Sequence, residues 1–440
     1  MNEPVSKSLI GTISAVTALA CGTLTAQTYI DDPRLDDQTH DRQGPFNYFL
    51  TPSDALGFMD SPKAFQLTGD GAYSSFWGEL TLWAGTPLKR LNSRVRTLDQ
   101  GCIPVINYGS LLDGIEYRVK SFAAPVGLDP QASLLGFCRI TATNPGTKPQ
   151  RVAVGARVYD VQGPWRQPLM DHTQPDWWIK RSMNQETWQP WKLWEPTSVI
   201  NSGEVHRTDS KHLIFHYQAD NSGWKVITAP DNIEPFEFVI QLAPGQSASV
   251  DVTIPFVPVA DERDEQVNAV AEAKFDDYLA RSSGFWQQQL NPATTFEVPE
   301  QKVMDMQKAS LMYDLMARDL QEDGKTWIQT VSDVQYNRFF SRDAAFIIHT
   351  YDMLGLPKIA RECLEYVLLK DDQGKLTGLR TTHPDAWGQA VWTLAAHYRI
   401  TGDRAFAERV YPVIPGHIAK LEEETAKDPW GLWPVAGPYD

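Results

Sequence analysis

The hydrophobic pattern of this chain changes its period near Val259, and this change divides the sequence into two kinds of structure. From residue 46 to residue 258, apolar and polar residues alternate in short runs that end at turn residues. Alternation places successive side chains on opposite faces of a strand, so this part is predicted to form antiparallel sheets packed as a sandwich. After Val259, apolar residues recur every three or four positions, which predicts helices.

Two runs late in the β region are predicted to form a hairpin. Residues 236–242 and 248–256 are rich in aromatic and β-branched residues, and a Pro-Gly pair lies between them. The second run is expected to bury one face of the strand. The residues predicted to share that face are Val250, Val252 and Ile254.

Helical periodicity accounts for most of the chain after the sandwich. A connecting helix is expected over residues 263–290, and a short extended linker follows at residues 295–298. Further helices joined by short loops then imply antiparallel helical hairpins. These helices are predicted at residues 299–320, within residues 335–355, and at residues 357–370, 384–400 and 405–424.

Composition excludes several classes of function. The formal net charge of −15 argues against nucleic-acid binding, because a phosphate backbone requires an excess of Lys and Arg. No apolar run reaches the roughly 20 residues of a membrane span. The four cysteines are far apart, so neither a local zinc site nor a dense disulfide scaffold is predicted. Cys102 and Cys138 are expected to form either a disulfide or two buried thiols, and no metal or cofactor is predicted.

Two segments of the N-terminal half bear on location and ligand. Residues 1–26 resemble a signal peptide, with an apolar stretch and small residues before Cys21, which predicts export to the periplasm, outer surface or medium. Cys21 is also a position for a lipid anchor, and the alternative is an ordinary N-terminal strand. Residues 163–196 hold six of the 15 tryptophans, which either cover the sandwich or present rings to a sugar.

The residues most suggestive of ligand binding lie directly before an apolar helix. Arg338, Arg342 and Asp343 stand among the rings of Tyr336 and Phe340, and Asp343 suits the positive end of the helix dipole. A guanidinium and a carboxylate can each bind two hydroxyls of a sugar, while the rings stack on its faces. The alternative is a helix capped by Ser341 that carries an ordinary ion pair.

Three stretches, in order, resemble the glucoamylase-like, six-hairpin glycosidases. YNRFFSRDA at residues 336–344 looks like the family's aromatic-rich segment ending in Arg-Asp. HPDAWGQAVWTLAAHYRITGD at residues 383–403 looks like its Gly-Gln, Trp-rich helix. WGLWPVAGPYD at residues 430–440 lies where that family places its general acid. In those proteins a sandwich precedes a toroid of six helical hairpins that holds the sugar at its centre.

The resemblance implies a multidomain β + α fold, with a large antiparallel β-supersandwich followed by an incomplete (α/α)6 toroid. The implied parts are a sandwich at residues 27–258, a linker helix and strand at residues 259–298, and a helical domain at residues 299–440. That domain holds only about five of the roughly twelve helices that the resemblance implies. The sequence is therefore expected to be the front part of a longer protein.

The resemblance also implies roles for individual residues. The residues expected to bind the sugar are Arg342, Asp343, Arg338, Tyr336, Phe340, Trp387, Trp430 and Trp433. Where the family has a Glu after Gly-Leu-Trp, this chain has Pro434, which has no proton to donate. Asp440 is then the candidate general acid, with a plain turn carboxylate as the alternative. The second carboxylate that an inverting mechanism needs is expected beyond residue 440.

These observations favour a glycoside hydrolase with a carbohydrate as its binding partner. One alternative is a non-catalytic carbohydrate-binding or assembly protein that keeps the sugar pocket. Another is a glycoside phosphorylase, which would need an anion site in place of the second carboxylate. The sequence does not predict the sugar, the linkage or the oligomeric state.

Overall fold

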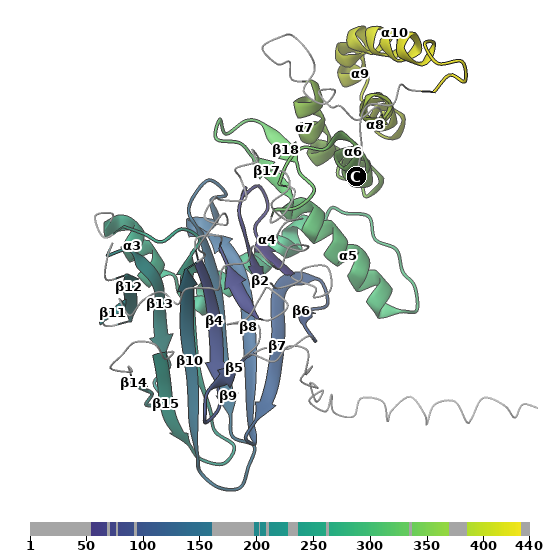
Figure 1. Ribbon diagram of the computed structural model, residues 1–440. Coiled ribbons are helices and arrows are strands. Elements are labelled where there is room, and N and C mark those ends of the chain that lie inside the picture. The colour runs from purple at the N-terminus through teal and green to yellow at the C-terminus, as the bar shows by residue number, and fades with distance from the viewer. Residues whose placement is uncertain are drawn as a thin grey trace, which may run out of the picture.

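A computed structural model describes residues 54–67, 71–75, 78–91, 95–160, 198–201, 203–207, 211–227, 236–260, 264–333, 337–368 and 385–432. In these residues a large antiparallel β region is followed by helices, which confirms the coarse β-then-α order (Figure 1). The predicted signal peptide and the tryptophan-rich residues 163–196 lie outside the described residues. The predicted domain boundaries stay a prediction.

Two eight-stranded antiparallel sheets make up the described β region. The first has the order β1-β2-β3-β4-β10-β15-β14, with β5 paired to β4. Its strands are β1 (Asp54–Gly57), β2 (Ala64–Leu67), β3 (Ala72–Ser74), β4 (Gly78–Ala84), β5 (Lys89–Arg90), β10 (Gln150–Asp160), β14 (Lys225–Ile227) and β15 (Phe236–Leu242). The second has the order β11-β12-β13-β16-β9-β8-β7-β6. Its strands are β6 (Thr97–Asp99), β7 (Ile103–Leu112), β8 (Ile115–Pro125), β9 (Leu134–Thr143), β11 (Ser198–Asn201), β12 (Glu204–Arg207), β13 (Leu213–Ala219) and β16 (Ser247–Pro255).

The two sheets pack face to face and form the sandwich. Across their interface, the Tyr73 hydroxyl of the first sheet makes hydrogen bonds with Tyr108 (3.0 Å) and Ser121 (2.5 Å) of the second. The Cys138 thiol lies against the same hydroxyl, and burial raises the pKa of this thiol to about 12. Cys138 and Cys102 are both free and buried, so the disulfide alternative is wrong and the buried-thiol alternative is confirmed.

The predicted hairpin of residues 236–242 and 248–256 is wrong. Its first strand, β15, pairs with β10 and β14, whereas its second strand, β16, belongs to the other sheet and pairs with β9 and β13. The turn between them therefore carries the chain from one sheet to the other. Asn144 fixes this crossing, because its side-chain amide donates to the Leu242 carbonyl (2.9 Å) and its own carbonyl accepts from Gly245. The alternation within β16 is correct, since Val250, Val252 and Ile254 are buried.

The connecting helix is two helices rather than one. α3 (Asp264–Glu272) and α4 (Phe275–Leu290) are separated at Lys274, whose backbone is extended. α4 covers the outer face of the second sheet. Its Phe275 ring packs edge-on against Phe122, and its Tyr278 ring stacks on Phe137.

The later helices agree with the predicted ones except at two places. They are α5 (Gln301–Met316), α6 (Ser341–Met353), α7 (Pro357–Leu368), α8 (Asp385–Thr401), α9 (Arg404–Val410) and α10 (Ile414–Thr425). The first ends at Met316, because the next residues form the hairpin of β17 (Arg318–Leu320) and β18 (Trp327–Gln329). The last predicted helix is divided by a 3-10 turn at Tyr411–Val413, which contains Pro412.

α6 and α8 run parallel to each other. Phe346 and His349 of α6 contact Trp392 of α8, and Asp352, further along α6, contacts His397, further along α8. α7 follows α6 after a three-residue connection and packs against both helices. A short connection of this kind joins antiparallel neighbours.

The β17–β18 hairpin lies between the sandwich and the helices (Figure 1). The sandwich reaches it through Asp60, whose N–H donates to the Arg318 carbonyl (2.8 Å) and whose carbonyl accepts from Leu320 (3.1 Å). Gly57 of β1 approaches the helical part still more closely. A Cβ at Gly57 would lie 3.0 Å from each of Ala64 Cβ, Met316 Cγ and Asp333 Oδ2. We call this contact region, formed by residues 57–62, 314–319, 333 and 337, the joint.

Replacing Gly57 with alanine is expected to lower the free energy of unfolding by about 1–3 kcal/mol, since the added methyl group has no room in the joint. The matched control is Gly284→Ala in the middle of α4, where nothing lies within 4 Å of the new Cβ. That substitution should stabilise the helix by about 0.5–1 kcal/mol. Urea denaturation of both variants measures the difference, and equal effects of the two substitutions would refute the close packing at Gly57.

Candidate functional site

The candidate site lies at the N-terminal end of α6. The described residues of the predicted set that meet there are Arg338, Phe340, Arg342 and Asp343, within residues 337–343. Phe340 occupies the N-cap position and makes no side-chain cap, so the predicted cap at Ser341 is wrong. Asp343 lies in the first turn, as predicted, where the helix dipole favours a negative charge.

The Asp343 carboxylate makes no hydrogen bond or salt bridge within the part of the chain that the structure describes. It is half-exposed, and the neighbouring Arg342 is exposed. Consecutive helix residues point in different directions, so these two side chains do not pair with each other. The alternative of an ordinary Arg-Asp ion pair is therefore wrong. A carboxylate in this position has its acceptor oxygens available to a ligand.

The aromatic residues of this segment have different surroundings. Phe339 packs edge-on against Tyr366 of α7, at 4.9 Å between ring centres, so it anchors the segment to the helices. Phe340 and Arg338 are half-buried beside it, and burial lowers the pKa of Arg338. The segment directly before Asp343 thus carries a half-buried ring and a half-buried guanidinium.

α6 buries Ala344, Ile348 and Tyr351, whereas its Phe346 is 57% exposed. The Phe346 ring lies 5.5 Å from the Trp392 ring of α8, and His349 contacts the same ring. Arg342 and Phe346 are four residues apart, so they share one helix face. This aromatic surface next to Arg342 was missed from the sequence, although the spacing of those two residues is a signal for it.

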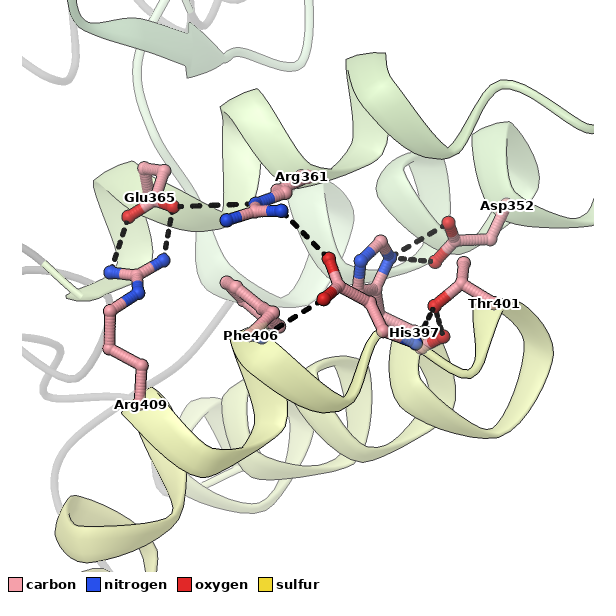
Figure 2. A network of polar contacts seen from close by, with 8 residues as sticks. Asp352, Arg361, Glu365, His397, Thr401, Phe406 and Arg409 are labelled. Atoms are coloured by element: carbon pink, nitrogen blue, oxygen red, sulfur yellow. Dashed lines mark hydrogen bonds and ion pairs between the residues drawn. The ribbon is translucent and has the colours of Figure 1, made fainter.

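A polar network holds the helices behind the site (Figure 2). His397 Nδ1 lies 2.9 Å from both carboxylate oxygens of Asp352, and both side chains are buried. Arg361 of α7 pairs with Asp403 at 2.8 Å. Asp403 in turn caps α9 by accepting from the Phe406 N–H, and this bond is the main cause of its lowered pKa. The network therefore joins α6 to α8 and α7 to α9.

Four carboxyl groups in or near the joint, two of them buried and two half-buried, were not identified from the sequence. Burial raises the pKa of Asp60 and of Asp314 to about 6 each. The positive charge of Arg318 lowers the pKa of Asp60 but does not cancel the effect of burial. Burial also raises the pKa of Asp319 and Asp333 well above the usual range, and the charge of Asp60 raises that of Asp319 further. Asp319 and Asp333 are almost completely buried, so no ligand in solution reaches them.

The remaining predicted residues are not brought to this site by the described structure. Trp430 follows α10 and is 83% exposed, and no hydrogen bond, ion pair or ring contact joins it to α6 in the described residues. Trp387 lies on α8, but its side chain is outside the described part. Tyr336, Trp433 and the candidate acid Asp440 also lie outside the described residues.

Other features of the described structure do not form a second candidate site. A surface hollow of about 460 Å³ beside Arg139 has its charged groups engaged internally, since Arg139 binds both Asp251 and Asp276. No group of three or more His, Cys, Asp or Glu side chains suited to a metal ion occurs among the described residues. No helix in the described part is long and apolar enough to cross a membrane.

Comparisons with known proteins give limited matches. No protein-family model matches the chain. A curated protein described as an uncharacterized glycosyl hydrolase, from Methanocaldococcus jannaschii, is 26% identical over 150 residues. The match covers 30% of this chain and 24% of that protein, so the chain spans about a quarter of its curated relative.

Two solved structures match this chain at low similarity. One is named "Putative kojibiose phosphorylase from human microbiome", with 7% identity, a TM-score of 0.39, and coverage of 81% of this chain and 50% of that one. The other is a polysaccharide lyase, with 9% identity, a TM-score of 0.22, and coverage of 86% of this chain and 69% of that one. Neither TM-score is high enough to define the fold of this chain.

Proposed function

We propose that this chain is part of a carbohydrate-active enzyme, a glycoside hydrolase, and that the N-terminal end of α6 binds a sugar ring. The observation that carries the proposal is the Asp343 carboxylate, which is half-exposed and has no partner within the described protein. Arg342 and Phe340 lie beside it. Together they supply hydrogen-bond acceptors, donors and a ring, which are the groups that recognise a sugar.

Two further observations support the proposal. The curated relative that shares 26% identity over 150 residues is described as a glycosyl hydrolase. In addition, α6 and α8 run parallel to each other, and α7 connects them in the sequence. This is the helix order expected of one repeat of a helical-hairpin toroid. We extend the proposal to an (α/α)6 toroid and, from residues 1–26, to an exported protein.

The described residues would act by binding and orienting the sugar. Asp343 would accept hydrogen bonds from two hydroxyl groups, and Arg342 would donate to others, which fixes the ring against Phe340. Bond cleavage needs a protonated acid and a second carboxylate, about 6.5–9.5 Å apart in inverting enzymes. Asp440 remains the proposed acid. The buried Asp319 and Asp333 are unsuitable for either role, because no sugar can reach them.

Replacing Asp343 with asparagine is expected to weaken sugar binding about 10- to 100-fold, the loss of one or two charge-assisted hydrogen bonds. The substitution keeps the shape of the side chain, removes its charge and replaces one acceptor oxygen with a donor amide group. Calorimetric titration of the intact protein with methyl glucosides and with α- and β-linked glucose oligosaccharides measures the effect. Unchanged affinity for a sugar that the wild-type protein binds would refute the role of Asp343.

The matched control is Asp277→Asn. Asp277 is the third residue of α4, as Asp343 is the third residue of α6, so both variants lose the same favourable interaction with a helix dipole. The control should leave sugar binding unchanged. Incubating the wild-type protein with the bound sugar, with and without phosphate, then distinguishes a hydrolase from a phosphorylase, and absence of cleavage in both cases favours a binding protein.

A further inference from the structure

Asn337 stands immediately before the candidate site and connects it to the sandwich. Its side-chain amide donates to the carbonyl of Pro62 (3.3 Å), which lies between β1 and β2 and is 275 residues away in the sequence. The same side chain lies close enough to the Asp319 carboxyl of β17 to lower its pKa. Asn337 is only 8% exposed, so these contacts are shielded from water and their loss would leave buried polar groups without partners.

Both partners of Asn337 belong to a rigidly held structure. Asp60, two residues before Pro62, makes two backbone hydrogen bonds with β17, at Arg318 and Leu320. Its carboxylate also pairs with Arg318 Nη1 at 2.8 Å, and Arg318 pairs with Glu362 of α7. The Pro62 carbonyl and the Asp319 carboxyl therefore keep a fixed spacing, and Asn337 bridges them.

The helix that follows the site is fixed separately. The Tyr351 hydroxyl of α6 donates to Gln329 Oε1 of β18 at 2.8 Å. The Gln329 side-chain amide donates in turn to the Ala317 carbonyl at 3.1 Å. The end of β18 and the start of α6 are thus two anchored points, and Asn337 and Phe339 are further anchors between them.

We propose that Asn337 is a positioning residue, through which the sandwich sets the position of Arg338, Phe340 and Asp343 for ligand binding. This inference rests on the proposed sugar site, and it assigns to the N-terminal sandwich a direct role in that site. Asn337 itself does not contact the sugar. It restricts the segment to one position before the ligand arrives, so the ligand does not bear the entropy cost of ordering it.

The test is Asn337→Ala, studied by native-state hydrogen exchange on the intact protein. Amides of residues 338–346 are expected to exchange at least about tenfold faster, because local opening no longer requires breaking the two Asn337 contacts. Amides of β8 and β9 should keep their protection. Affinity for the glucose-containing probe sugars should fall by a similar factor, since the free segment now occupies positions that do not bind.

The matched control is Asn144→Ala, which removes an equally buried asparagine whose amide donates to the carbonyls of Lys148 and Leu242 at the crossing between the sheets. It should leave exchange of residues 338–346 unchanged. Unchanged exchange of those residues in Asn337→Ala overturns the inference, as does a uniform increase over the sandwich and the segment together. If the wild-type protein binds none of the probe sugars, the proposed function fails, whereas the exchange data still decide whether Asn337 positions the segment.

Discussion

Replacing Arg318 with alanine is expected to lower the free energy of unfolding by about 3–5 kcal/mol, because the change leaves two carboxylates in a buried site without their cation. The Arg318 side chain is only 2% exposed. It pairs with Asp60 at 2.8 Å and with Glu362, and its guanidinium lies 5.1 Å from the centre of the Trp327 ring. Since these partners come from the sandwich, α7 and β18, the loss would loosen all three at once.

The cost of this substitution should increase with pH. Burial raises the pKa of Asp60 to about 6, and the charge of Arg318 opposes that rise. Without Arg318 the pKa of Asp60 moves higher still, so the folded protein holds a proton on Asp60 at pH values where the unfolded chain has released it. The variant should therefore be closest to wild type near pH 4 and furthest from it near pH 8.

Urea denaturation at several pH values, followed by tryptophan fluorescence, measures this loss. Arg409→Ala is the matched control, because Arg409 pairs with Glu365 on the surface and is 47% exposed. Surface pairs contribute about 0–1 kcal/mol, so the control should remain near wild type throughout. A loss below about 1 kcal/mol for Arg318→Ala at every pH would show that the joint tolerates the two carboxylates without Arg318.

The hydrophobic pattern was sufficient to predict strands and helices but not which strands pair. The Pro-Gly turn after β15 correctly indicates a reversal of the chain. However, the same turn residues can connect two strands of one sheet or two strands of different packed sheets. The difference is made by Asn144, more than 90 residues from the turn, whose amide and carbonyl hold Leu242 and Gly245. No local pattern contains that information.

The candidate site shows the same limit. Two of the Arg-Asp pairs in the chain lie at residues 318–319 and at residues 342–343. The first is completely buried in the joint, whereas the second lies on an accessible helix end. The second pair was selected from the sequence because the aromatic residues before it resemble a segment of known glycosidases. The role of the first pair became visible only when the fold placed Asp60 against it, from more than 250 residues earlier in the sequence.

Asp319→Asn is expected to stabilise the protein, and to do so more strongly as the pH rises. Burial, and then the charge of Asp60, raise the pKa of Asp319 well above its usual range, so the folded state retains a proton that the unfolded chain loses near pH 4. The contribution of Asp319 to the stability of the wild-type protein is therefore most favourable at low pH, and it falls until the pH exceeds the folded-state pKa of Asp319. An asparagine at this position carries no such cost, and its carbonyl can still accept from Asn337.

The gain from Asp319→Asn should grow by up to about 1.4 kcal/mol per pH unit between the two pKa values of the carboxyl. Asp333→Asn should act in the same direction, but the two gains will not add, because the charge of Asp319 raises the pKa of Asp333. Asp276→Asn is the control: Arg139 lowers the pKa of Asp276, so its contribution is lost only in acid and stays constant between pH 5 and pH 8. Stability curves of equal slope for wild type and Asp319→Asn over that interval would mean that Asp319 is already ionised in the folded protein.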